Sequence, residues 1–429
     1  MEIIKINTSF EGKPLLLRFV CAFIILLISA SCQSYDGESK TTLSETLSDI
    51  SKERVAYAGF ALMGSTESFS SRYKYSVSFE KSINKTLFES VRGLQPKYYN
   101  LITDKIIDAD KGSSIALAFA LEHEKILVEK ISNFYKLSVS FTAQALVIDF
   151  DSSEGAIIAS YPVILPQQTY VEIFEGRKPK DQEIANIVKQ YFLGGLTHID
   201  QSTQKEVAFG SLVKQFKAVI KNAPIKAKYA QEIGIGKVDF KEEVKKILPE
   251  SYRNNTQDFG QALGQYLAAR LSENQGVSVV PQNIDNSSAQ MALRFTGSKS
   301  AQFLSLPKPD YLLNMNVRAI VSKVSKKTSI SQLNSYLSVV KFTLNYNVGS
   351  ESEAIFSRNF VDGHFKSIPK TMVFDDWYAK ESSIYFLIDR FSKNIDNPKK
   401  NSGWASIQEF DRSDYKQLKK LNEVLEKCR

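Results

Sequence analysis

Side chains suited to nucleophilic or metal chemistry are scarce in this chain of 429 residues, which holds only three histidines and three cysteines. His123, His198 and His364 lie far apart in the sequence, and a lone histidine is more often a surface or turn residue than a base. His123-Glu124 is not followed by a second histidine four residues on, so the helical zinc pair of many metalloproteases is missing. We therefore expect no metal and no cofactor.

The patterns for binding phosphate and calcium are incomplete. Residues 234–237 (GIGK) lack the Ser or Thr that follows the lysine of a P-loop. Asp108–Gly112 and Asp149–Ser153 have the opening spacing of calcium loops, but Phe119 and Ser160 stand where such loops carry their last glutamate. A G-x-S-x-G nucleophile motif is missing as well. These absences favour a protein that is not an enzyme.

Cys32 is the residue whose surroundings predict a specific modification. It follows a ten-residue apolar run, Phe19–Ile28, and three small residues, with basic residues before the run. A spanning helix needs about 20 apolar residues, so this run is typical of a signal peptide. The segment resembles a bacterial lipobox, although Ser29 stands where the lipobox favours Leu. The resemblance implies cleavage after residue 31 and lipidation of Cys32, so residues 1–31 are predicted to be a lipoprotein signal peptide. The alternative is an ordinary secretory signal with an incidental cysteine.

Residues 32–54 are predicted to be the lipidated cysteine and a flexible tether, because they are rich in Ser, Thr and charge and cannot bury apolar surface. Gln33 follows the cysteine, and by resemblance to enterobacterial sorting it implies the outer membrane, with the protein facing the periplasm. Palmitate and other acyl chains would bind it to membrane lipid. Cys21 leaves with the signal and Cys428 stands alone, so no intramolecular disulfide is expected.

The composition predicts a folded, basic protein. Apolar residues make up 43% of the chain and aromatic residues 11%, which excludes a disordered chain, and 20 Gly exclude a collagen-like one. The formal net charge is +8. Export makes nucleic acid an unexpected partner, so anionic lipid heads, lipopolysaccharide phosphates or acidic wall polymers are the available polyanions. A solvated basic surface without a specific partner is the equal alternative.

A two-strand pattern occurs twice and indicates a tandem duplication. In the first half, a strand opening with Leu-Ser-Val runs over 137–150, and a second strand follows at 156–161 after an acidic turn. In the second half, another Leu-Ser-Val opens a strand over 337–348, and its partner follows at 354–358. Apolar and polar residues alternate along 340–348, which is typical of a half-buried antiparallel strand.

Helices recur around these strand pairs. Phe259, Leu263, Leu267 and Leu271 form one helical face, with Asp258 as the expected cap and Gly276 just past the end. Each half also begins with a short strand and ends with an amphipathic helix.

Each half therefore reads as strand, helix, four strands and a final helix. We predict an α+β fold of two similar domains, each a mainly antiparallel sheet with helices on one face. The first domain would cover 55–204, and the second 205–397 with a basic join at its start. A charged helical tail would occupy 398–429.

The second half resembles an outer-membrane lipoprotein superfamily. This superfamily includes CsgG-like curli-secretion lipoproteins, penicillin-binding-protein activators and the TolB N-terminal domain. The resemblance rests on the helix 259–275 (FGQALGQYLAARLSENQ), the strand 277–281 (VSVVP), the segment 309–321 (PDYLLNMNVRAIV) and the strand pair with its acidic turn. The first half lacks the Pro-Asp-Tyr start. The resemblance implies a non-enzymatic assembly part of the cell envelope.

These patterns together predict a lipid-anchored interaction or assembly protein of the envelope, with an envelope protein as partner. One alternative is a subunit of an oligomeric outer-membrane secretion channel, in which the strand pairs 137–161 and 337–358 insert in the membrane. An envelope hydrolase is a further alternative, against which the missing nucleophile and metal motifs count. Whether the chain forms a homo-oligomer stays open.

Overall fold

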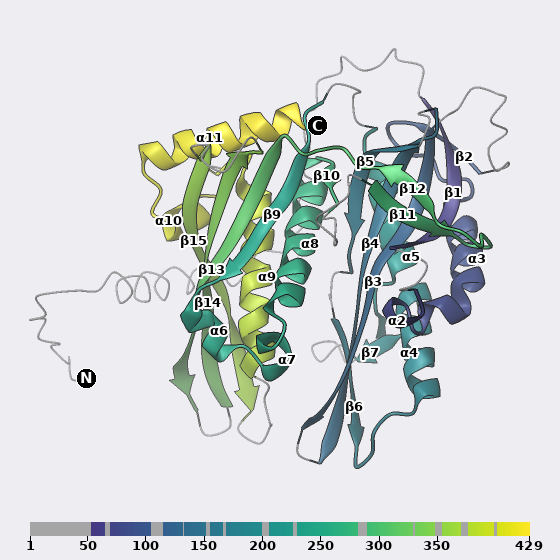
Figure 1. Cartoon of the computed structure of the whole chain (residues 1–429). Coiled ribbons are helices and arrows are strands. Elements are labelled where there is room, and N and C mark those ends of the chain that lie inside the picture. The colour runs from purple at the N-terminus through teal and green to yellow at the C-terminus, as the bar shows by residue number, and fades with distance from the viewer. Residues whose placement is uncertain are drawn as a thin grey trace, which may run out of the picture.

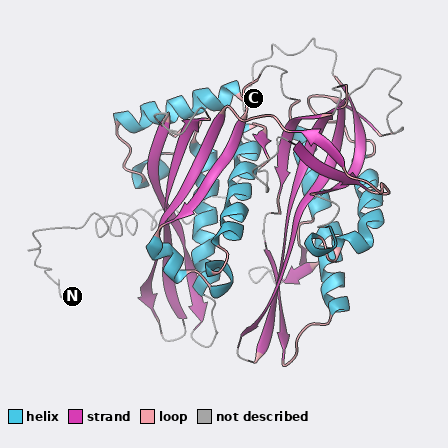
Figure 2. Ribbon diagram, viewed as in Figure 1, coloured by secondary structure: helices cyan, strands magenta, loops and turns pink. Residues whose placement is uncertain are grey.

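The computed structural model shows two large sheets and two helical layers stacked in alternation, together with a small two-stranded sheet (Figures 1 and 2). It describes residues 53–64, 69–103, 115–131, 133–151, 155–165, 169–199, 206–225, 230–281, 290–328, 331–347, 354–369, 376–398 and 401–429. Helices α8 (Thr256–Gln275) and α9 (Asp376–Asn394) lie between the sheets. The far side of the first sheet carries α3 (Glu80–Val91), α4 (Asp181–Leu193) and α5 (Leu212–Asn222). The predicted α+β fold with two sheet-containing regions is confirmed.

The first sheet combines parallel and antiparallel pairs. Strand β1 pairs in parallel with β2 and β3, whereas β4 runs antiparallel to β3, β5 and β6. The strands are β1 (Arg54–Met63), β2 (Asn100–Ile102), β3 (Ile115–Ile131), β4 (Phe134–Asp149), β5 (Ala156–Val163) and β6 (Thr169–Glu175).

The second sheet repeats this order and these directions. Strand β9 pairs in parallel with β10 and β13, and β14 runs antiparallel to β13 and β15. The strands are β9 (Ile233–Phe240), β10 (Val279–Val280), β13 (Tyr311–Lys327), β14 (Ser331–Tyr346) and β15 (Phe356–Pro369). A bulge interrupts β3 between Leu121 and His123, and a bulge interrupts β13 between Val317 and Ala319. The two bulges occupy the same place, because both follow the seventh residue of their strand.

The Leu-Ser-Val triplets that suggested the duplication are not equivalent positions. Leu121 pairs with Ala143 and Val317 with Val340, so the fourth strands correspond at an offset of 340 − 143 = 197, whereas the triplets are 200 apart. Leu137 is therefore buried in the first core, while Leu337 is half-buried on the opposite face of its sheet. Side chains alternate between the two faces of a strand, so an alignment that is wrong by an odd number of residues assigns each side chain to the opposite face.

A hairpin from the second half completes the first sheet. Strands β11 (Gln290–Phe295) and β12 (Gln302–Ser305) lie between the predicted strand 277–281 and the segment 309–321. Strand β11 pairs with β1, and β12 pairs with β5. Because β3 and β4 lie between β1 and β5, the strand pairs form a closed ring in the order β1, β3, β4, β5, β12 and β11. Met291, Leu293 and Leu304 cover a face of the sheet that is lined with alanines. Arg294 forms an ion pair of 2.6 Å with Glu80 at the hairpin edge.

Packing shifts the predicted domain limits. Helix α5 buries Leu212, Phe216 and Ile220 in the first core, although its residues were assigned to the second domain. The predicted charged tail packs as α10 (Ser402–Ile407) and α11 (Arg412–Lys427), which bury Trp404 and Leu421 in the second core. The apolar side chains of α11 recur every three or four residues, and this spacing was the signal that the charge obscured.

The remaining elements are short. They are α2 (Phe69–Arg72), η3 (Ser76–Phe79), β7 (Thr197–Ile199), β8 (Glu206–Ala208), α6 (Glu242–Ile247) and α7 (Glu250–Arg253).

The ends of α8 are set by a polar cap and a glycine. Asn255, rather than the predicted Asp258, caps the start by accepting a hydrogen bond from the Asp258 amide. Gly276 ends the helix in the left-handed conformation, with φ of +66°, as its position predicted.

Replacing Gly276 with Ala is expected to lower the free energy of unfolding by about 1 kcal/mol, because a Cβ is strained at positive φ. No other atom lies within 4 Å of the added Cβ, so the loss of stability would come from the backbone conformation and not from a steric clash. Urea denaturation measures it. The matched control is Gly403→Ala in α10, which has no positive φ and should be neutral or slightly stabilising. Equal effects at the two positions would contradict the left-handed cap.

Candidate functional site

The predicted lipidation site is not described by the structure. Cys32, the signal peptide of residues 1–31 and most of the tether all lie outside the described residues. Among the helices that are described, none is long and apolar enough to cross a membrane. Cys428 is buried in the second core beside α11.

The histidines and acidic turns do not converge. His123, His198 and His364 lie on strands of three different sheets. His364 packs on the ring of Tyr336 at 5.6 Å. The acidic turn at 108–112 lies outside the described residues, and Asp149 ends β4. The described part of the chain contains no group of three or more His, Cys, Asp or Glu side chains placed to hold a metal.

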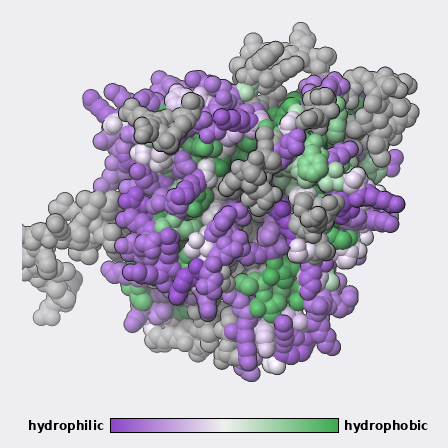
Figure 3. All heavy atoms as spheres, viewed as in Figure 1, coloured by the Kyte–Doolittle hydropathy of each residue, from purple (hydrophilic) through white to green (hydrophobic). Residues whose placement is uncertain are grey.

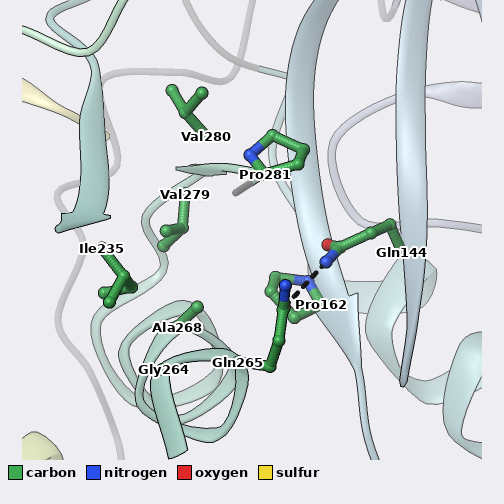
Figure 4. A pocket seen from close by; sticks show the side chains of 9 residues that line it. All are labelled: Gln144, Pro162, Ile235, Gly264, Gln265, Ala268, Val279, Val280 and Pro281. Carbon is green, nitrogen blue, oxygen red and sulfur yellow. Dashed lines mark hydrogen bonds between the residues drawn. The ribbon is translucent and has the colours of Figure 1, made fainter. Parts of the chain in front are cut away.

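The most organised polar group of the described chain lies instead between the domains. Gln144 of β4 donates to Glu122 and to Gln265 at 3.0 Å each, and Gln265 of α8 donates to Glu122 at 2.8 Å. The three side chains thus form a closed ring of hydrogen bonds, which we call the interdomain triad. Ser160 adds a hydrogen bond of 2.9 Å to Gln144. Figure 4 shows Gln144 and Gln265 reaching toward each other from their separate domains.

The β3 bulge positions the acidic member of the triad. It falls at Glu122, so this carboxylate faces α8 while Leu121 stays in the first core. Bulges commonly redirect a side chain in this way. Burial raises the pKa of Glu122 to about 6, against the opposing effects of the Gln144 hydrogen bond and the Arg72 charge. Both carboxylate oxygens accept amide hydrogens, which satisfies the ionised form.

Helix α8 can approach the first sheet because small residues line that side. Gly264 and Ala268 flank Gln265, and Phe259 and Leu263 on the other side enter the second core. Residues 263–269 of α8 are all buried, which is typical of a helix that lies between two layers. Ser278 joins the layers again by accepting a hydrogen bond of 2.9 Å from the Ser160 backbone amide.

A second contact places Lys125 of the first sheet on an aromatic ring of the second domain. The Lys125 ammonium lies 4.8 Å from the centre of the Tyr252 ring. Burial lowers the pKa of Lys125, and the charges of Asp258 and Glu381 oppose that shift. Burial also raises the pKa of Glu381 to about 7, against a hydrogen bond from Tyr385 and the charges of Lys136 and Lys125.

The interface leaves little room for a ligand. A pocket with only about 10 Å³ of space for a water-sized molecule lies beside Gln144, Gln265 and Pro281 (Figure 4). Pockets for drug-sized ligands usually measure about 300–1,000 Å³. The polar atoms of the triad already bond to one another, so the arrangement is suited to coupling the domains. The charged residues within 121–125 (LEHEK), in an otherwise apolar strand, were the available sequence signal for the triad, and the metal-site motif at His123 and Glu124 does not include Glu122.

Comparisons with known proteins assign no family. No family model matches the chain, and no curated protein matches it. Structural similarity was found to the hypothetical protein CT253 of Chlamydia trachomatis, with 10% identity, a TM-score of 0.22, and coverage of 40% of this chain and 96% of that one. Protein XCC0632 of Xanthomonas campestris has 13% identity, a TM-score of 0.21, and coverage of 43% and 92%. A putative neuraminyllactose-binding hemagglutinin homolog of Helicobacter pylori has 13% identity, a TM-score of 0.20, and coverage of 47% and 98%. These similarities support no functional assignment.

Proposed function

We propose that this chain is a lipid-anchored, non-enzymatic interaction protein of the bacterial envelope, attached to the outer membrane and facing the periplasm. The observation that supports an interaction role is the interface between the two domains, which leaves little space for a ligand. The triad satisfies its own polar atoms across the two domains, and the donated hairpin ties them together. The two domains then act as one rigid body that meets partners with its outer faces. The lipobox-like segment before Cys32 supports the anchor.

Replacing Cys32 with Ser is expected to abolish incorporation of an alkyne-labelled palmitate analogue and to release the protein from the outer-membrane fraction. The acyl chains bury methylene groups at about 0.8 kcal/mol each, and without them only the protein surface remains to bind lipid. In-gel fluorescence and density-gradient fractionation of cells that express the full chain measure the two effects.

The chain supplies its own matched control for this experiment. Cys21 lies within the apolar run, eleven residues before Cys32, and Cys21→Ser should leave both labelling and fractionation unchanged. A Cys32→Ser protein that still takes up label and stays in the outer membrane would overturn the anchor. Recovery of enzymatic activity that a single substitution abolishes without altering the thermal unfolding would overturn the non-enzymatic role.

A further inference from the structure

The second sheet exposes a face that the first sheet buries. Side chains of β13 and β14 alternate between buried positions, which face α8 and α9, and half-buried positions, which face outward. Val321, Leu337 and Val339 form an apolar strip on the outward side, and Val321 pairs directly with Leu337. We call this side the open face. The space-filling view shows that the visible surface of the second domain is largely hydrophilic (Figure 3), so such a strip needs an explanation.

The charged residues of β13 and β14 around the strip are all basic, and Asp239 of β9, which shares the outward face, forms an ion pair with Lys237 at 3.5 Å. Residues 311–347, which contain all of β13 and β14, include no Asp or Glu. Arg318 and Lys341 lie next to the strip, and Lys323 is exposed beside it on β13. No carboxylate forms an ion pair with these three among the described residues.

The internal repeat indicates what such a face holds. At offsets of 196 for the third strand and 197 for the fourth, Arg318 corresponds to Glu122 and Lys341 to Gln144. Those two first-sheet residues hold Gln265 of α8 through the triad. The centre of the open face is therefore the counterpart of a place where a helix docks, with cations in place of the polar pair.

The charge pattern of the internal interface supports the same conclusion. The Lys125 ammonium of the first sheet lies 4.8 Å from the centre of the Tyr252 ring of the second domain, and the charges of Asp258 on α8 and Glu381 on α9 raise its pKa against the effect of burial. A sheet lysine is thus electrostatically coupled to helix carboxylates at the interface that this fold already contains. Complementary charge of this kind favours docking and excludes like-charged surfaces.

A second copy of the chain does not have the right charge for this face. The helices that a second copy would present, as the next layer in the stack, are α3, α4 and α5. Their exposed charged side chains are mainly basic: Lys81, Lys85, Lys189, Lys214, Lys217 and Lys221, against Glu89 and Asp181. Stacking them on the open face would place cations against cations.

We propose that the open face is the docking surface for a different envelope protein, which presents a helical surface with carboxylates and apolar side chains. The proposal rests on the proposed function, of which it specifies the partner. The partner's carboxylates would meet Arg318 and Lys341, and its apolar side chains would cover Leu337 and Val339.

The test places a photo-crosslinking amino acid, p-benzoylphenylalanine, at position 339 of the full chain in its native cells. Mass spectrometry maps the peptide that is captured. The matched control carries the same crosslinker at Phe88, an exposed aromatic position on α3. We expect position 339, and not position 88, to capture an acidic amphipathic helical segment of one envelope protein.

Charge reversal tests the electrostatic part. The double substitution Arg318→Glu and Lys341→Glu is expected to reduce the adduct at least about tenfold, because like charges then face each other. The control changes the net charge equally with Lys416→Glu and Lys420→Glu on exposed α11 positions, and should keep the adduct. Circular dichroism melting establishes that each variant is folded.

The outcomes separate this proposal from the proposed function. An adduct with a second copy of the chain, with lipid, or with a non-acidic segment overturns it, and so does an adduct that survives charge reversal. Loss of any adduct at position 339, while Cys32 still takes up palmitate, overturns the docking surface alone. An acidic helical adduct without lipidation at Cys32 would support the surface and overturn the anchor.

Discussion

Replacing Ala118 with Leu is expected to lower the free energy of unfolding by about 3 kcal/mol and to expose the β11–β12 hairpin. Ala118 is fully buried in the cluster where Met291, Leu293 and Leu304 rest on the first sheet. Its strand is held on both sides, because Ala118 pairs with Gly59 of β1 and with Leu146 of β4. The backbone cannot move away, so the larger side chain must lift the hairpin. Overpacking of this kind costs about 1–3 kcal/mol.

Urea denaturation of the full chain measures the loss, and hydrogen exchange of residues 290–295 reports release of the hairpin. The matched control is Ala218→Leu at an exposed position of α5, which should change stability by less than about 0.5 kcal/mol. Equal stability of the two variants would mean that the hairpin does not pack on this face. Loss of stability with unchanged exchange at 290–295 would place the strain elsewhere in the sheet.

The elements of both domains were accessible from the sequence because each strand and helix carries its own periodic pattern. The strands predicted over 137–150 and 156–161 correspond to β4 and β5 of the structure. The place of the β11–β12 hairpin was not accessible, since nothing within 290–305 specifies which sheet it joins. The sequence signal for the hairpin lies in the strand that it covers, because Ala118 and Ala120 of β3 alternate with larger side chains. This small-residue face fits a layer that lies close against it.

The interdomain triad could not be predicted from the sequence for a related reason. Glu122 and Gln144 lie on neighbouring strands, but Gln265 is more than 120 residues further along the chain, and only tertiary packing brings it close. The bulge that turns Glu122 toward α8 has no marker such as glycine in β3. The repeated strand pattern was visible in the sequence, although the Leu-Ser-Val triplets supplied the wrong register for it.

Replacing Gln144 with Leu is expected to lower the free energy of unfolding by about 3 kcal/mol at pH 7.5. Gln144 donates to Glu122 and Gln265 and accepts from the Ser160 hydroxyl. Leucine fills a similar volume but leaves the buried carboxylate with one donor fewer and the Ser160 hydroxyl without this acceptor. An unsatisfied buried group costs about 1–3 kcal/mol, and more when it is charged.

The loss should shrink at pH 5, because the folded-state pKa of Glu122 is about 6, above its ordinary value of 4.5. Between these values the folded state binds more protons than the unfolded chain. Stability from this group is therefore fully present below about pH 4.5 and is lost as the pH rises through 6, a change of roughly 2 kcal/mol in the wild type. Because the ionised carboxylate depends most on Gln144, the variant should lose most where Glu122 is ionised.

Urea denaturation at pH 5 and pH 7.5 measures both effects. Burial also raises the pKa of Glu381 to about 7 and of Asp362 to about 6, but these carboxyl groups are common to the wild type and the variant, so they largely cancel in the difference. The matched control is Gln182→Leu on the exposed side of α4, which should be nearly neutral at both pH values. An equal cost of Gln144→Leu at the two pH values would show that Glu122 keeps one protonation state throughout, and the triad would then couple the domains without responding to pH.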